Sequence, residues 1–208
     1  MELFWLIPLF PGASALILAV LGKWLPKKYI TWQACLSVLA SFGLSLVSFF
    51  GLVKVSAGSL PVVKTLFPWI AAGSFKADLA FQLDPLSSVM TLVVTGVGFL
   101  IHVYSVGYMA HDKGYTRYFT YLNLFTFAML ILVTGANLVL MFVGWEGVGL
   151  CSYLLIGFWF EKHSAANAGK KAFIVNRIGD AAFIMGILFI FLVVGSGDFR
   201  GINGAIQG

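Results

Sequence analysis

Charged residues are scarce in this sequence: only 10% of its 208 residues are charged, whereas 60% are hydrophobic. Soluble domains carry about 25% charged and about 45–50% apolar residues, so a soluble globular protein and a disordered chain are excluded. The 13 basic residues are scattered rather than clustered on one face. The net charge of +5 therefore does not indicate a nucleic-acid partner. The class that remains is an all-α polytopic membrane protein.

Cysteine is scarce too, because only Cys35 and Cys151 occur, both in apolar runs. Two thiolates are too few for an iron–sulfur cluster, which takes about four, and we interpret both as small core residues. The sequence shows no zinc-ligand spacing, no phosphate-binding glycine motif and no Ser/His/Asp set. We therefore expect no metal, no bound cofactor and no redox centre in this chain.

Six apolar runs are long enough to cross a bilayer, which takes ~20 helical residues. The stretch from Tyr118 to Phe160 has one formal charge, Glu146, and as one helix it would be roughly 65 Å long, so it must fold back. Its best turn is residues 135–137, Gly-Ala-Asn. We predict a single transmembrane domain over residues 1–208, with spans at ~3–22, ~30–53, ~86–109, ~117–134, ~138–160 and ~171–195.

The long loop from Ser56 to Asp84 contains the predicted strands. From Phe75 to Leu83 apolar and polar residues alternate, which is the period of a strand with one buried face. The run from Val62 to Phe67 can pair with it across residues 68–74. We expect a short β-hairpin at ~61–84, between the second and third spans, on the outer membrane face and covered at its edges by protein.

Basic residues are divided unequally between the two sets of loops. Those that follow the first, third and fifth spans hold Lys23, Lys27, Lys28, Lys113, Arg117, Lys162, Lys170 and Lys171. The other side holds Lys54, Lys64, Lys76 and Arg200. Short cytoplasmic loops are enriched in Lys and Arg, so we predict an N-terminus outside and the three more basic loops in the cytoplasm.

Three formal charges lie deep inside predicted spans, where each costs ~2.5–3.5 kcal/mol to insert. Glu146 lies near the middle of the fifth span, among glycines that weaken a helix and let another helix or water approach. Its carboxyl group can handle a proton or form a fixed structural ion pair. Arg177 and Asp180 stand three residues apart and can pair on one helix face, as a self-neutralising pair or as a polar relay.

Three more residues are candidates for supporting roles. His102 lies in the third span, where a histidine is more often a packed core residue, although imidazole titrates nearest to neutral pH. Trp145 lies in mid-span beside Glu146 and could shield that carboxylate from lipid. Lys171 starts the sixth span and is expected to extend its ammonium group into the cytoplasmic interface.

The fifth span resembles the signature of the L-type (chain 5) antiporter-like subunit of proton-pumping NADH:quinone oxidoreductase, respiratory complex I. The run from Gly144 to Trp159 reads GWEGVGLCSYLLIGFW. The runs Lys171–Phe173 (KAF), Asn176–Asp180 (NRIGD) and Phe81–Ser87 (FQLDPLS) match the same family, and the resemblance covers essentially all six spans. Related cation/proton antiporter subunits share the Trp-Glu pair but typically lack the Gly-Val-Gly and Asn-Arg-x-Gly-Asp combination.

The resemblance implies a proton-translocating membrane-arm subunit in which Glu146 pairs with a lysine of a seventh span. Arg177 and Asp180 match the family's span-6 positions. The implied partners are other membrane and peripheral subunits of complex I, neighbouring antiporter-like subunits and the lipid bilayer. NADH, FMN, iron–sulfur clusters and quinone are implied in those subunits, and none is bound by this chain. The sequence ends at Gly208, before the partner lysine, so we interpret it as an N-terminal fragment.

Two alternatives stay open at this stage. A sodium/proton antiporter subunit has the same fold, and a non-conducting structural membrane subunit would use the same spans without ion flow. For the location we expect the bacterial inner membrane, ahead of the mitochondrial inner membrane or the thylakoid.

Overall fold

The structure of the protein is a computed structural model that describes residues 3–55, 60–73 and 75–207. Within these residues, six helices are long and apolar enough to cross a membrane, and a two-stranded antiparallel sheet lies between the second and third of them. The helical elements are η1 (Phe4–Leu6), α1 (Leu9–Leu21), α2 (Lys27–Val53), α3 (Pro85–Tyr108), α4 (Tyr115–Thr134), α5 (Leu138–Ile156), α6 (His163–Val194) and α7 (Phe199–Gln207). The strands are β1 (Val62–Ala72) and β2 (Phe75–Leu83). The predicted fold class is confirmed.

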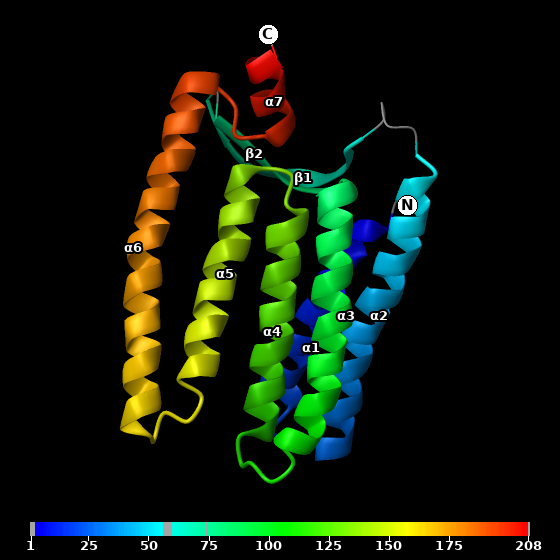
Figure 1. Ribbon diagram of the computed structural model, residues 1–208, viewed down its shortest axis with the longest axis vertical. Coiled ribbons are helices and arrows are strands. Elements are labelled where there is room, and N and C mark those ends of the chain that lie inside the picture. Colours follow the sequence, from blue (N-terminus) through cyan, green and yellow to red (C-terminus); the bar gives the residue numbers. More distant parts are fainter. Residues whose placement is uncertain (1–2, 56–59, 74, 208) are drawn as a thin grey trace.

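The long helices form a bundle that has α6 at one side (Figure 1). Going across the view, α6 is followed by α5, α4, α3 and α2, and α1 lies behind them against α4 and α2. The loops that join α3 to α4 and α5 to α6 lie at one end of the bundle, where α2 also begins. The β-hairpin and α7 lie at the opposite end. The more basic loops therefore share one end, which we call the basic end.

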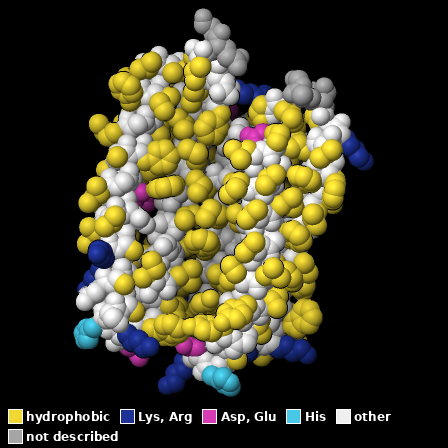
Figure 2. Space-filling view, viewed as in Figure 1, with side chains coloured by type: hydrophobic (Ala, Val, Ile, Leu, Met, Phe, Trp, Pro, Cys, Tyr) yellow, Lys and Arg dark blue, Asp and Glu magenta, His cyan; other side chains and the backbone are white. Residues whose placement is uncertain are grey.

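The surface fits this arrangement. Hydrophobic side chains cover most of the visible face of the bundle, and Lys, Arg and His side chains stand out at its lower end (Figure 2). Large apolar side chains such as Leu100, Ile178 and Leu192 are mostly exposed. A surface of this kind is stable in hydrocarbon and not in water.

Side-chain caps fix the starts of two helices. The Asp84 carboxylate accepts a hydrogen bond from the Ser87 amide at 2.7 Å, and the Ser87 hydroxyl accepts one from the Asp84 amide at 2.8 Å. This capping box, with Pro85 in the first turn, starts α3 directly after the hairpin. The sequence FQLDPLS thus joins the end of a strand to a capped helix.

The predicted turn between the fourth and fifth spans is confirmed, and it also holds the hairpin. The Asn137 side chain caps α5 by accepting from the Leu140 amide at 2.8 Å, and it donates to the carbonyl of Asp78 at 2.7 Å. Gly135 forms an isolated bridge with Phe81 of β2. These hydrogen bonds hold the hairpin against the α4–α5 turn. The buried hairpin side chains Phe81 and Leu83 pack in one hydrophobic cluster with residues of the helices.

The hairpin is longer than the sequence pattern indicates. The predicted first strand ends at Phe67, whereas β1 continues through Pro68 to Ala72, which pairs with Phe75. Proline is tolerated there because each strand of a two-stranded sheet has a free edge that needs no amide donor. The pairing shifts register on either side of Pro68, and Gly73, with φ of +60°, begins the reversal.

Several helix ends also differ from the predicted spans. The helix α6 begins at His163, eight residues before the predicted start, because the alanine-rich segment 164–168 favours a helix whether or not lipid surrounds it. The helix α5 ends at Ile156, before Gly157, rather than near residue 160. The first span is divided by Pro8, between η1 and α1. The helix α7 has no counterpart among the predicted elements.

Candidate functional site

The three predicted intramembrane charges meet at the contact between α5 and α6. Arg177 Nη1 lies 2.5 Å from Glu146 Oε1 across the interface, and 3.8 Å from Asp180 Oδ2 on its own helix. The predicted Arg177–Asp180 pair is therefore present. The addition of Glu146 was not predicted, because spacing along a sequence does not give the rotation of one helix against another.

Trp145 completes this group by holding Asp180. Its indole Nε1 donates a hydrogen bond to Asp180 Oδ1 at 2.8 Å, and its ring packs edge-on against Phe183 with centroids 5.7 Å apart. Each oxygen of Asp180 thus faces one donor, an indole or a guanidinium. The role expected for Trp145 was to shield Glu146, whereas its polar contact in the structure is with Asp180. We call Trp145, Glu146, Arg177 and Asp180 the ion cluster.

The members of the ion cluster differ in exposure. Asp180 is buried, while the side chains of Arg177 and Glu146 are 54% and 26% exposed. The guanidinium also lies over the ring of Phe173, 5.1 Å from its centroid. One guanidinium therefore serves two carboxylates, and the three charged groups carry a formal charge of −1. A low-dielectric site with one excess negative charge favours a proton or a second cation.

Glycines of α5 set the position of Glu146, as the sequence suggested. A side chain at Gly144 would lie 2.4 Å from the backbone nitrogen of Leu132 on α4, and one at Gly147 would lie 2.8 Å from Ala128. On the other side, a side chain at Gly149 would lie 3.7 Å from Asn176 of α6. Gly144 and Gly147 therefore let α4 approach α5 closely beside the glutamate, whereas a side chain at Gly149 would make an ordinary contact with α6.

The other predicted supporting residues lie apart from the ion cluster. His102 of α3 is fully buried, and its Nδ1 is 2.7 Å from the carbonyl oxygen of Gly98. Its Nε2 has no hydrogen-bond partner among the residues that the structure describes. Lys171 is exposed on α6, inside the helix rather than at its start. The roles of both residues stay predictions.

The described part of the chain contains neither a disulfide nor a cluster of metal ligands. Cys35 and Cys151 are free thiols, and Cys151 is buried. Over residues 3–55, 60–73 and 75–207, no three His, Cys, Asp or Glu side chains are grouped so that they could hold a metal ion.

Solved structures with the same arrangement of helices are membrane complexes. The chain superimposes on part of the Mrp complex from Dietzia sp. DQ12-45-1b with a TM-score of 0.78 and 24% identity, covering 96% of this chain and 20% of that one. It also matches the membrane-bound sulfane sulfur reductase, an archaeal respiratory membrane complex, with a TM-score of 0.80 and 17% identity, covering 97% and 39%. The fold of the described residues is that of an integral membrane protein built from six long helices.

Sequence comparison identifies the family. Residues 69–119 match the N-terminal family of chain 5 of NADH-ubiquinone oxidoreductase (complex I), and residues 135–207 match the transmembrane family of NADH:quinone oxidoreductase and Mrp antiporters. The two matched segments together make up more than half of the chain. The chain belongs to the complex I chain 5, or subunit L, family of antiporter-like membrane subunits, as its motifs indicated.

Curated relatives agree. The chain is 44% identical over 201 residues to NAD(P)H-quinone oxidoreductase subunit 5 of the organellar chromatophore of Paulinella chromatophora, covering 96% of this chain and 30% of that protein. It is 43% identical over 201 residues to NADH-quinone oxidoreductase subunit L of Mycobacterium tuberculosis, covering 95% and 31%. It is also 40% identical to the chloroplastic subunit 5 of Mesostigma viride. The chain spans about a third of the length of these relatives.

Proposed function

We propose that this chain forms part of a proton-translocating membrane-arm subunit of NADH:quinone oxidoreductase, and that Glu146 takes and releases the proton. The observation that carries the proposal is the excess carboxylate of the ion cluster, where Arg177 contacts both Glu146 and Asp180. Asp180 is buried and held by Trp145, whereas Glu146 is partly open, so Glu146 is the carboxylate free to change its protonation.

The proposed transfer depends on which cation stands beside Glu146. In the structure this cation is Arg177, whose Nη1 lies 2.5 Å from the Glu146 carboxylate. When the cation withdraws, an unpaired carboxylate inside the membrane is costly, and Glu146 takes a proton instead. The resemblance implies a lysine on a further helix of the longer family proteins, and that lysine would compete with Arg177 for the same carboxylate. Moving one charge across 100 mV requires ~2.3 kcal/mol, so the separation of the ion pair must change the energy by at least this amount.

The redox reaction belongs to other subunits in this proposal. NADH, FMN, iron–sulfur clusters and quinone would be bound by partner subunits, and their reaction would drive the movement of the cation. The proposed location is a bacterial inner membrane, with the N-terminus outside. The distribution of basic residues supports this orientation, because the more basic loops share one end of the bundle.

The experiment compares two glutamate variants in the assembled complex within sealed vesicles. We expect Glu146→Gln to abolish or strongly depress NADH-driven proton pumping. The matched control is Glu161→Gln, which removes an exposed carboxylate just beyond α5, and it should pump normally. Pumping at the normal rate by assembled Glu146→Gln complexes would overturn the proposal.

The same vesicles distinguish the sodium/proton antiporter, because the family matched by residues 135–207 includes Mrp antiporters. A pH gradient that forms fully without sodium supports proton translocation. A gradient that requires sodium would favour the antiporter.

A further inference from the structure

A basic cavity opens at the basic end of the bundle, on the side away from the ion cluster. It has a volume of about 610 Å³ and lies where the end of α1 and the starts of α2 and α4 meet. Lys23, Lys27, Lys113 and Arg117 line it, while Ala19 and Leu25 form the accessible part of its apolar wall. Neither aspartate nor glutamate is among its described lining residues, so the cavity carries four formal positive charges. We call it the basic cavity.

Helix geometry adds to this positive charge. The helices α2 and α4 both start at the basic cavity, and the residues before them, Pro26 and Gly114, provide no side-chain cap. The first turn of each helix also has no acidic residue. The first amide groups of α2 and the positive end of its dipole therefore favour an anion at this place, whereas at the start of α4 the Asp112 carboxylate already accepts from the Gly114 amide.

Two cations of the basic cavity are held in place by local contacts. The ammonium of Lys27 donates to the carbonyl of Ala110 at 2.9 Å. The Arg117 guanidinium donates to the carbonyl of Phe158 at 3.1 Å and lies 4.7 Å from the centre of that ring. The Nε atom of Arg117 is buried and has no acceptor in the part of the chain that the structure describes. The contact with Ala110 thus holds the Lys27 ammonium near the cavity, whereas the Arg117 guanidinium is held against Phe158, which is not among the lining residues of the cavity.

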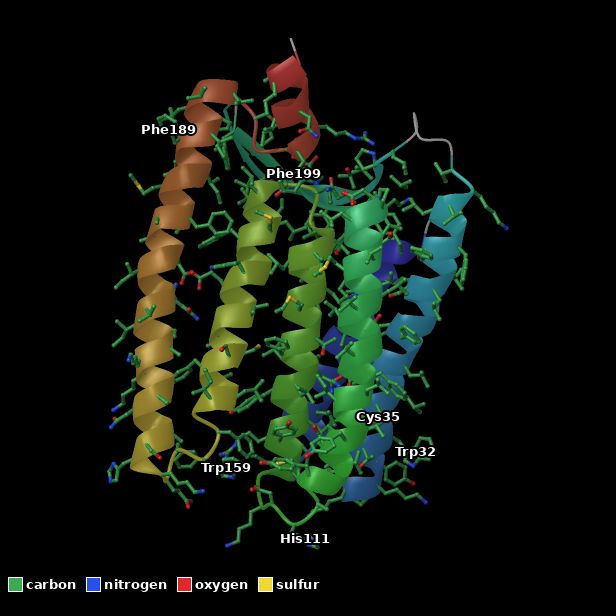
Figure 3. The ribbon with its side chains drawn as sticks, in the orientation of Figure 1. Trp32, Cys35, His111, Trp159, Phe189 and Phe199 are labelled. Carbon is green, nitrogen blue, oxygen red and sulfur yellow. The ribbon has the colours of Figure 1, made fainter. Side chains whose placement is uncertain are left out.

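One neighbouring carboxylate, Asp112, interacts with Arg117 and Lys27 and offsets one of the four positive charges. Asp112 lies beside the cavity, with Oδ1 accepting from the Gly114 amide at 2.6 Å and Oδ2 accepting from the Trp159 indole at 2.9 Å. Trp159, His111 and Trp32 all lie at the same end of the bundle (Figure 3). Tryptophan at this level is typical of the region where lipid headgroups meet the hydrocarbon.

We propose that the basic cavity binds one anionic phospholipid. Its phosphate would lie among Lys23, Lys27 and Lys113, and its acyl chains would run along Ala19 and Leu25 toward the hydrocarbon. A cationic rim above an apolar wall complements a molecule that is anionic at one end and apolar at the other. Free phosphate would use only the rim, and a zwitterionic lipid would gain little from its charge. This proposal is independent of the role of Glu146.

The test counts the lipids that the protein retains, by native mass spectrometry of the purified protein in mild detergent. We expect one bound phosphatidylglycerol per chain and no comparable binding of phosphatidylcholine. The triple variant Lys23→Gln, Lys27→Gln and Lys113→Gln should bind phosphatidylglycerol about 100-fold more weakly, at about fivefold for each basic side chain. Circular dichroism of the variant verifies its helices.

A matched control removes the same charge from the other end of the molecule. The variant Lys54→Gln, Lys64→Gln and Lys76→Gln should retain the lipid with wild-type affinity, and so should Glu146→Gln. Equal loss in both triple variants would overturn the site, and so would equal binding of phosphatidylcholine by the wild type. If inorganic phosphate displaces the lipid at equal concentration, the cavity binds a simple anion and the proposal of a bound phospholipid is wrong. A protein segment as occupant would give no phospholipid mass and would also overturn the proposal.

Discussion

Substitution of Gly144 by alanine tests whether close contact between α4 and α5 positions Glu146. The added carbon would lie 2.4 Å from the nitrogen and 2.6 Å from the Cα of Leu132, and both are backbone atoms that cannot rotate away. Ordinary contacts begin near 3.4 Å, so the helices must separate by about 1 Å. Overpacking of this kind costs about 1–3 kcal/mol. The displaced helix also carries Glu146, two residues further along.

The control is Gly179→Ala on α6, where no described atom lies within 4 Å of the added carbon. Both substitutions gain about 1 kcal/mol from the better helix propensity of alanine, so the difference between them isolates the steric cost. We expect Gly144→Ala to be less stable than Gly179→Ala by about 1–3 kcal/mol in denaturation by SDS, followed by circular dichroism in lipid–detergent micelles. Equal stability of the two variants would refute the close contact.

Two further predictions concern the polar contacts. Trp145→Phe keeps an aromatic ring against Phe183 but removes the hydrogen-bond donor to buried Asp180, so its free energy of unfolding should fall by about 1–2 kcal/mol in the same assay. The control is Trp32→Phe, which changes an exposed indole. Equal losses in the two variants would contradict the prediction. Hydrogen bonds from the Trp159 indole and the Gly114 amide hold the pKa of Asp112 below its usual range. The ionised carboxylate therefore stabilises the folded protein when the pH is above the ordinary pKa of aspartate. This stabilisation is lost as the pH falls through the pKa of Asp112 in the folded protein. Asp112→Asn should therefore be less stable than wild type at pH 7, and the difference in stability should shrink as the pH falls below about 4. A difference in stability that does not change with pH would contradict this prediction.

The features that could be predicted from sequence are those written into short stretches of the chain. Six apolar runs indicate six helices, because length and hydropathy are properties of each run. The turn before Asn137 was predictable for the same reason, since Gly and Asn reverse a chain locally. The motif FQLDPLS carries its own capping box. The start of α6 was misplaced because charge marks where lipid ends rather than where a helix ends.

The ion cluster and the basic cavity needed the packed structure. Glu146 and Arg177 are 31 residues apart, and only the rotation of α5 against α6 brings their charged atoms together. Nothing in the sequence predicts the hydrogen bond from Trp145 to Asp180. Only the mid-span position of Trp145, beside Glu146, made it a candidate. The cavity unites Lys23 with Lys113, from loops far apart in sequence, and neither loop by itself indicates a binding site. Pairing across helices is a tertiary property that local patterns do not contain.

Infrared difference spectroscopy of the complex in membranes measures whether Glu146 changes its protonation when the protein works. During NADH oxidation we expect the carbonyl-stretch signal of a protonated carboxyl group, shifted when the water is replaced by D₂O. This signal should vanish in Glu146→Gln and persist in Glu161→Gln. A signal that stays unchanged in Glu146→Gln would show that another group carries the proton, and would contradict the account.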